Sequence, residues 1–196
     1  MPIPQPQVQV IETAVRSILE AVGESTASGH FQRTPYRVGK MLSDILDGNY
    51  KPLDLDRLTT FANDGSYKGI VIVHRVPFYS FCAHHLMPFF GHFALGYLPG
   101  DQVLGLSKLV RVFRYFCKKP TTQETITQAP LDVLDDILGG TPGYRGAMCM
   151  VTAEHTCMSM RGVQAHGAKT TTSAYSGAFQ DDLALRQQFL ATAQDS

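Results

Sequence analysis

The residues best suited to chemistry in this chain are two cysteines and three histidines in two short segments, 82–85 and 155–157. They are Cys82, His84, His85, His155 and Cys157. Together they offer two thiolates and an imidazole to one metal ion, and either histidine of the adjacent pair could be the imidazole ligand. Three protein ligands with an open fourth position are typical of catalytic zinc, whereas structural zinc sites close with four. The pattern therefore predicts a catalytic zinc centre that only a folded core can assemble.

The predicted position of His155 follows from the geometry of a β-strand. The segment from Tyr144 to Cys157 is apolar enough to predict a β-strand, whose side chains alternate between two faces. One face would then carry Cys149, Val151, Ala153, His155 and Cys157. His155 is expected beside the metal thiolate, where acid–base chemistry is favoured over the role of a packed core histidine. Cys117 and Cys149 lack a partner motif and are interpreted as structural.

A second group of residues suggests an anion site. Ser107, Lys108 and Arg111 fall at the start of a predicted helix that Ser107 would cap. Unpaired backbone N–H groups and the helix dipole favour a negative charge there. Arg161 follows the last thiolate by four residues. A lone lysine or arginine is usually a solvated surface cation, so the hypothesis of a phosphate site depends on these residues clustering near the metal.

Longer motifs surround these residues and carry a resemblance. They are CAHHLMPFFG at 82–91, GLSK at 105–108, QE at 123–124 and HTCMSMRG at 155–162. In this order and at these separations they resemble the GTP cyclohydrolase I family, over a stretch from about Ile11 to Leu190. One position departs from the family pattern, because the first motif usually reads Cys-Glu-His-His and this chain has Ala83.

The resemblance implies a role for each residue of the metal motif. It assigns Cys82, His85 and Cys157 to Zn²⁺ and leaves His84 for proton transfer. A zinc ion with three protein ligands lowers the pKa of a bound water toward neutrality, which would supply the hydroxide that attacks C8 of the guanine ring. His155 is the expected acid that protonates N7.

The resemblance also implies how GTP is held. The triphosphate would be bound by Lys108, Arg111 and Arg161, with Arg37 contributed by a neighbouring subunit, while Ser107 would lie near the ribose. Gln123 and Glu124 would contact guanine, since an ionised carboxylate can accept from N1–H and the exocyclic amine together. Taken alone, Glu124 in a first helical turn is more often a capping residue, here in a capping box with Thr121.

The implied reaction is hydrolysis of the GTP imidazole ring with loss of formate and closure to 7,8-dihydroneopterin triphosphate, the first step of folate and pterin biosynthesis. Ala83 keeps a second enzymatic outcome open: a partial ring-opening hydrolase, or a paralogue that feeds 7-deazaguanine or specialised pterin metabolism. A non-catalytic zinc-containing binding scaffold is a third reading, and it would require a fourth protein ligand. A zinc nucleobase deaminase is disfavoured because its His-x-Glu and Pro-Cys-x-x-Cys pattern is absent.

Composition limits the class of protein. The chain has 196 residues, which suits one domain. Lys plus Arg and Asp plus Glu number 17 each, so no broad basic field is available for nucleic acid. No apolar stretch reaches the roughly 18 to 20 residues that span a bilayer. Four irregularly spaced cysteines without a signal peptide indicate a reducing, cytoplasmic setting.

The expected architecture is α+β. Residues 1–7 hold three prolines and predict a flexible arm, followed by one domain over residues 8–196. Helices are predicted at 11–22, 34–46 and 107–119 and from 121 onward, where Pro130 should kink or break the helix. Strands are predicted at 69–76, 89–98, 144–157 and 161–174.

The order of these elements resembles the tunnelling fold (T-fold) of the same family. That fold has a four-stranded antiparallel sheet, N-terminal helices and two helices inserted between strands. Apolar edge strands would be an aggregation hazard in a monomer, so sheets are expected to join into a barrel within a ring oligomer. The resemblance implies a homodecamer of two stacked pentamers with active sites between subunits.

Overall fold

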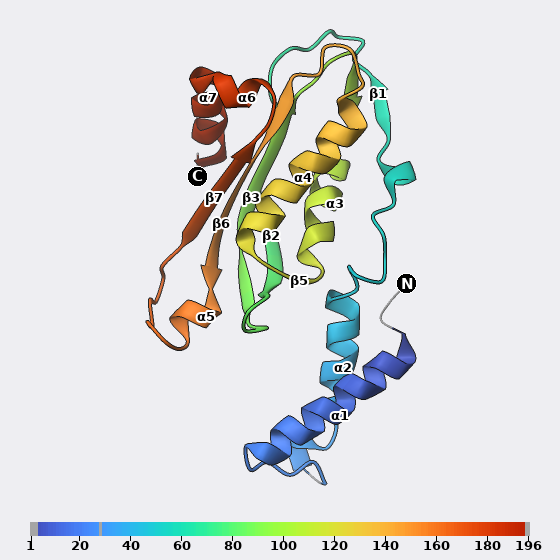
Figure 1. Cartoon of the computed structure of the whole chain (residues 1–196), viewed down its shortest axis with the longest axis vertical. Coiled ribbons are helices and arrows are strands. Elements are labelled where there is room, and N and C mark those ends of the chain that lie inside the picture. Colours follow the sequence, from blue (N-terminus) through green and yellow to red (C-terminus); the bar gives the residue numbers. More distant parts are fainter. Residues whose placement is uncertain (1–3, 28, 195–196) are drawn as a thin grey trace. The chain divides into compact units, whose positions relative to one another are not determined.

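The computed structural model describes residues 4–27 and 29–194, and the chain folds as two compact units, Met1–Pro52 and Leu53–Ser196 (Figure 1). The prediction of a single domain over residues 8–196 stays a prediction. Within the described residues, no helix has both the length and the apolar character needed to cross a membrane.

The first unit is a helical hairpin of α1 (Gln5–Ala21), a short 3-10 turn η1 (Gly29–Phe31) and α2 (Thr34–Ile45). The two long helices pack closely at Gly39, where an added Cβ would lie 2.9 Å from the Glu12 side chain. Both helices were predicted. However, α1 already begins at Gln5, so residues 5–7 belong to the helix and not to the predicted arm, and residues 1–3 lie outside the described part of the chain.

The second unit is built on a five-stranded sheet in the order β5-β2-β3-β6-β7. Its strands are β2 (Val71–Cys82), β3 (Pro88–Leu98), β5 (Pro120–Thr121), β6 (Gly146–His155) and β7 (Thr170–Tyr175). The four long strands are antiparallel, while the two-residue β5 pairs in parallel with the end of β2. The α+β class and the four-stranded antiparallel sheet are confirmed, with β5 as an unpredicted fifth strand.

The remaining elements lie before, between or after these strands. A separate pair is formed by β1 (Thr60–Ala62) and β4 (Gln102–Leu104), and a 3-10 turn η2 (Leu55–Arg57) precedes it. Two helices are inserted as predicted, α3 (Leu106–Cys117) and α4 (Gln123–Leu138). Three further helices were not predicted. α5 (Thr156–Ser159) follows β6, and α6 (Ala178–Asp181) and α7 (Leu183–Gln194) follow β7.

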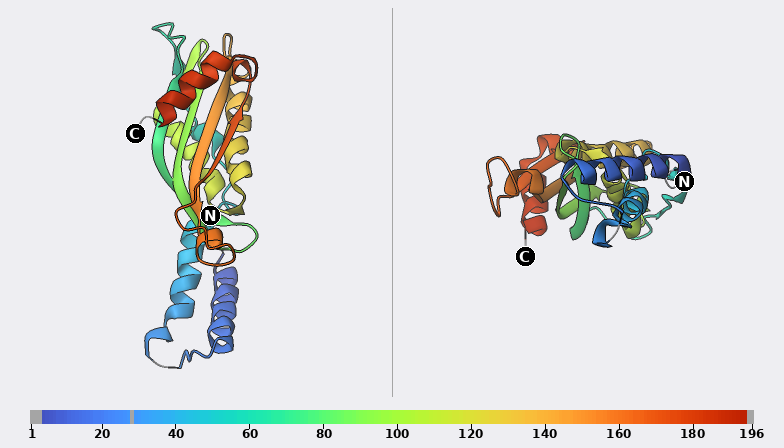
Figure 2. Two further views of the ribbon diagram at one scale, coloured as in Figure 1. Left: turned by 90° about the vertical axis from the view of Figure 1, so that its left-hand side faces the viewer. Right: turned by 90° about the horizontal axis from the view of Figure 1, so that it is seen from below.

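Alternation along β6 separates two layers of core. Cys149 and Val151 point into the main core with α3 and α4, whereas Met148 and Met150 point to the other face. There they pack in a cluster with Phe179 of α6 and a buried phenylalanine of α7. Figure 2 shows α7 across one face of the sheet and α4 behind the other. Both faces of the sheet are therefore covered around residues 148–151 of β6.

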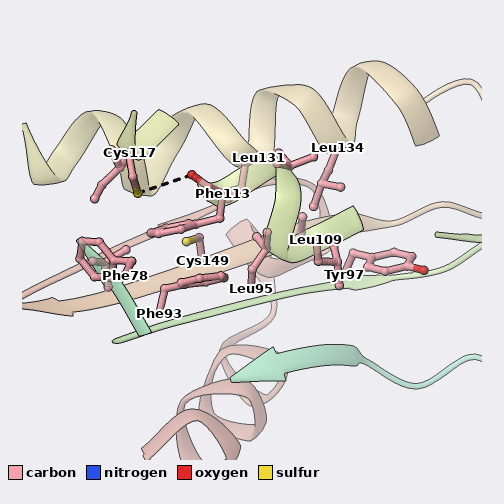
Figure 3. Packing of buried hydrophobic residues seen from close by; sticks show 14 of the residues in the cluster. Phe78, Phe93, Leu95, Tyr97, Leu109, Phe113, Cys117, Leu131, Leu134 and Cys149 are labelled. Carbon is pink, nitrogen blue, oxygen red and sulfur yellow. Dashed lines mark hydrogen bonds between the residues drawn. The ribbon is translucent and has the colours of Figure 1, made fainter. Parts of the chain in front are cut away.

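Aromatic rings fill the main core (Figure 3). Phe113 of α3 stacks on Phe93 with ring centroids 3.6 Å apart, and it meets Phe78 edge-on at 5.4 Å. The two cysteines interpreted as structural lie in this core, where burial raises the pKa of Cys117 to about 12 and also raises the pKa of Cys149. Their thiols are thus neutral packing groups.

Two predicted helix caps were wrong. α3 begins at Leu106 after Gly105, so Ser107 lies inside the first turn with an exposed side chain and does not cap it. α4 is capped by Thr122, whose hydroxyl accepts from the backbone N–H of Thr125 at 3.3 Å. Thr121 belongs to β5 instead, because its backbone is used in pairing with β2.

The predicted break at Pro130 was also wrong, since α4 continues through it to Leu138. Proline removes one helical hydrogen bond. The side chains of Leu131 and Leu134, fully buried one and four residues later, hold this part of the helix against the sheet and offset that loss.

Strand ends differ from the prediction as well. β2 extends to Cys82, while β6 stops at His155 and the fourth strand begins only at Thr170. At Gly91, on β3, an added Cβ would lie 1.9 Å from the carbonyl oxygen of Thr152 on β6. Only glycine allows the two strands to approach this closely beside the candidate site.

Candidate metal centre and substrate site

The candidate metal ligands come together at the end of the sheet where β2 and β6 finish (Figure 1). Cys82 is the last residue of β2, and its N–H donates to the Met87 carbonyl across a tight turn. Leu86 in this turn has a left-handed backbone with φ of 52°. The next N–H, of Ala83, donates to Thr121 of β5 at 3.0 Å. The turn that carries the two histidines is therefore held at both ends.

The donor atoms of Cys82, His85 and Cys157 all lie within 4.8 Å of one another. Sγ of Cys82 is 3.6 Å from Nδ1 of His85. Ligand atoms around a tetrahedral zinc lie about 3.6 to 3.8 Å apart when Zn–S is about 2.3 Å and Zn–N about 2.0 Å. The set thus fits zinc without rearrangement of the backbone, and the two thiolates and one imidazole are donors that zinc prefers.

His84 and His85 are distinguished by this geometry. Nδ1 of His84 is 3.8 Å from Sγ of Cys82, but His85 is the histidine that also lies near Cys157. Both imidazoles are exposed, and their rings meet edge-on at 6.2 Å. The cluster therefore contains His85, and His84 lies beside it with an exposed ring.

The surroundings of Cys157 and His85 favour a bound cation. Burial raises the pKa of Cys157, and the neighbouring Cys82 raises it further, so two adjacent thiolates require a positive charge between them. The far nitrogen of His85, Nε2, lies 2.6 Å from the guanidinium of Arg161. Arg161 is thus brought to the edge of the metal cluster, as the anion-site hypothesis requires.

His155 lies beside the cluster at the end of β6 and is half-buried. Its ring stacks on Phe89 with centroids 4.6 Å apart and planes 4° from parallel. Nε2 lies 2.7 Å from Oε1 of Gln123. Burial lowers the pKa of His155, and the charge of Glu124 opposes that shift. The ring is therefore held in one plane, within electrostatic reach of a carboxylate.

Gln123 and Glu124 open α4 but point into different surroundings. Gln123 is only 3% exposed, and its amide bonds within the protein. Glu124 is exposed in the first turn, where the helix dipole favours its charge. Glu124 is thus available to a ligand beside His155, while the side chain of Gln123 is not.

Three of the residues predicted to hold the nucleotide, Ser107, Lys108 and Arg111, lie on α3 of this unit. The carbonyl of Cys117, at the end of α3, accepts from the Ser80 hydroxyl at 3.0 Å, two residues before Cys82. Ser107 starts the same helix ten residues earlier, so about 15 Å of helix separate it from that end. Lys108 and Arg111 share the first turns of α3 with Ser107. The start of α3 is therefore separated by most of the helix from the end beside Ser80, and the predicted clustering of these three residues with the metal stays a prediction.

Arg37 lies on α2 in the first compact unit and is one of the residues around a shallow hollow of about 440 Å³ on that helix. Its predicted role stays a prediction. Sequence reasoning missed the contact of Phe89 with His155, because the signal is the pairing of these two residues across β3 and β6. That register becomes visible only when the sheet is known.

Comparison with known proteins agrees with this site. Residues 11–194 match the family model described as GTP cyclohydrolase I. The chain is 42% identical over 183 residues to GTP cyclohydrolase 1 of Clostridioides difficile (strain 630), covering 92% of this chain and 93% of that protein. It is 41% identical over 190 residues to GTP cyclohydrolase 1 of Geobacillus sp. (strain WCH70), covering 96% and 98%.

Among solved structures, the archaeosine synthase QueF-Like in its apo form matches 57% of this chain and 97% of its own, at 14% identity and a TM-score of 0.41. A similarity at that level carries no argument about this site. The family model and the two relatives each span more than nine-tenths of the chain, including every residue of the metal cluster. The chain belongs to the GTP cyclohydrolase I family.

Proposed function

We propose that the protein is a zinc-dependent GTP cyclohydrolase that converts GTP to 7,8-dihydroneopterin triphosphate with release of formate. The observation that carries this proposal is the Cys82, His85 and Cys157 cluster with His155 at its side. Family membership supports GTP as the substrate. The same cluster contains three protein donors and no fourth histidine, cysteine or carboxylate among the described residues, which disfavours a purely structural zinc.

Zinc bound to this cluster would supply a Lewis acid that activates water for attack on C8 of the base. The chain's own residues would orient the base and transfer protons. Ring stacking on Phe89 orients His155, which we assign to protonation at N7 of guanine. His84, exposed on the turn, moves protons to and from solvent as the ring opens and formate leaves.

Glu124 is the proposed contact for the guanine base. Its carboxylate is exposed at the start of α4, and its charge acts on His155, so both groups face the same space. A carboxylate that accepts from N1–H and the exocyclic amine discriminates guanine from adenine, which presents no donor at N1. Recognition of the base and protonation of its ring would thus occur within one small volume.

The triphosphate site is proposed to be completed by a neighbouring subunit. Arg161 lies at the metal cluster, whereas Ser107 and Lys108 are about 14 to 15 Å of helix, and Arg111 about 9 Å, from the end of α3 whose carbonyl bonds Ser80 in the same chain. Assembly would bring the start of α3 from a second copy to the cluster, and Arg37 of another copy would add a further cation. The proposed assembly is a homodecamer of two pentamers in the cytoplasm, where the four free thiols stay reduced.

The exposed edge of the sheet supports an assembly. β7 lies at one edge of the order β5-β2-β3-β6-β7, and its outer backbone groups are open to pair with another chain. Sedimentation velocity at micromolar concentration should show a single large species. A monomer that still turns over GTP would contradict the proposal of a shared site.

Mass spectrometry of GTP incubated with zinc-loaded protein tests the reaction. Dihydroneopterin triphosphate and formate are the expected products, and the Cys157→Ser variant should give neither. Accumulation of a ring-opened formamidopyrimidine would instead favour a partial hydrolase. Unchanged GTP in the presence of bound zinc would refute the proposal.

A further inference from the structure

The side-chain amide of Gln123 is enclosed by groups of its own chain. Nε2 lies 3.1 Å from the Val151 carbonyl, 3.0 Å from the Thr170 carbonyl and 3.1 Å from the Thr172 hydroxyl. On the other side, Oε1 lies 2.7 Å from Nε2 of His155. A residue that is 3% exposed and bonded on both sides has no open face for a nucleotide.

These contacts determine which way the amide points. Backbone carbonyls only accept hydrogen bonds, so the atom facing Val151 and Thr170 must be the NH₂ group. The oxygen of Gln123 must then face His155. Since an amide oxygen only accepts, Nε2 of His155 must be the donor and must carry a proton. The ring is left with Nδ1 as its only other nitrogen for chemistry.

A short chain of hydroxyls supports this orientation. The Thr127 hydroxyl donates to the backbone carbonyl of Gln123 at 2.7 Å, so its oxygen is free to accept from Thr172 at 2.6 Å. The Thr172 hydroxyl, having given its proton to Thr127, turns its oxygen to Nε2 of Gln123 at 3.1 Å, where it shares one of the two amide protons with a backbone carbonyl. Every donor in the cycle has an acceptor, which is the arrangement that makes a buried polar network rigid.

We propose that the side chain of Gln123 positions His155 and does not contact the guanine base. It fixes the proton on Nε2, holds the ring against Phe89 and leaves Nδ1 to exchange the proton with the substrate. This inference rests on the proposed function for its kinetic consequence, but the geometry of the ring can be tested without turnover. It also corrects the role that family resemblance implied for Gln123.

The kinetic test uses zinc-loaded Gln123→Met, which keeps the length of the side chain and removes its polar atoms. We expect kcat to fall by about 10- to 100-fold, the range seen when a partner that orients a functional histidine is lost, while KM for GTP changes less than about two-fold. Gln128→Met is the matched control, because Gln128 is exposed on the same helix and its amide donates to Asp132 at 2.9 Å. A substrate contact would instead raise KM.

Coupling to His155 separates positioning from a general loss of structure. In a His155→Ala background, Gln123→Met should cause less than about a two-fold further loss of kcat, because the group on which Gln123 acts is gone. A loss in that background as large as in the wild type would overturn the proposal. So would a weaker equilibrium affinity for GTP in the double variant than in His155→Ala alone.

Gln123→Asn is a second variant that tests the same inference if Gln123→Met does not fold. Its amide keeps donors for the carbonyls of β6 and β7 but withdraws the oxygen from His155 by about one bond length, about 1.5 Å. We expect the same loss of kcat as with Gln123→Met. Crystal structures of both variants should show the His155 ring turned or in two orientations. An unmoved ring would refute positioning, whereas absence of product from the wild type would refute only the proposed function.

Discussion

The exposed Ala83, where the family pattern has glutamate, invites a restoring substitution. Its N–H is held by Thr121, and its side chain is open to solvent, so Ala83→Glu should fold without a clash. The new carboxylate would lie beside His84 and His85, one and two residues along the turn. If Ala83 limits the reaction, product formation should rise because a carboxylate stabilises the positive charge that develops on His84 when it takes up a proton.

The magnitude follows from distance and screening. Neighbouring Cα atoms are 3.8 Å apart, which puts the charges about 6 Å from each other. At that distance a pair of unit charges interacts by about 0.7 to 1.4 kcal/mol for effective dielectric constants of about 80 to 40, as suits an exposed turn. Such a gain in the transition state corresponds to a rate increase of about 3- to 10-fold.

The assay is the initial rate of dihydroneopterin triphosphate formation, followed by fluorescence after oxidation to the pterin. Ala83→Gln is the matched control, because it has the same shape without the charge. The gain from Ala83→Glu should shrink at about 1 M salt, where the Debye length is about 3 Å. An equal gain from glutamine, or no gain from glutamate, would refute the electrostatic reasoning.

Three further outcomes are expected. Cys157→Ser should lose bound zinc by elemental analysis, whereas Cys149→Ala should retain it, because only the first residue belongs to the cluster. After zinc is chelated, iodoacetamide at mildly alkaline pH should modify Cys157 but leave Cys117 and Cys149 unmodified, since burial raises the pKa of both core thiols far above the pH of the assay; peptide mapping would contradict this if all three reacted alike. Phe113→Ala should lower the unfolding free energy by about 3 to 5 kcal/mol, because a fully buried ring is lost from two aromatic contacts, and Tyr79→Ala, at a ring that is 72% exposed, should change it by only about 0.5 kcal/mol in urea titrations.

The metal cluster was predictable because its geometry is local. A Cys-x-x-His spacing on a tight turn confines two donors to one place. The alternation of β6 also correctly predicts that Cys149 and its neighbour Met148 point to opposite faces of the sheet. The third ligand, Cys157, was expected on this strand but lies in α5, two residues after β6 ends, so the alternation of the strand does not place it. Which histidine joins the cluster was not decided by spacing, since either ring can approach Cys82.

The errors arise where tertiary structure outweighs local preference. Packing of α4 on the sheet overrides the helix-breaking tendency of Pro130, and β5 takes Thr121 away from the expected cap. The start of α3 was expected near the metal, but sequence patterns do not show which end of that helix lies beside the strand that carries Cys82. The buried network of Gln123 was equally invisible, because its partners lie on two other strands.

The two-residue strand β5 has a consequence for protein engineering. It ties the metal turn to the start of α4, through Cys82 paired with Thr121 and the hydrogen bond from Ala83. Extra residues between α3 and α4 would therefore shift the Cys82 thiolate and the Glu124 carboxylate together. The exposed turn around Gly65, in contrast, has open space around its Cα and no link to the cluster. Tags or reporter domains inserted there should leave the catalytic end of the sheet undisturbed, whereas the linker through β5 tolerates no change in length.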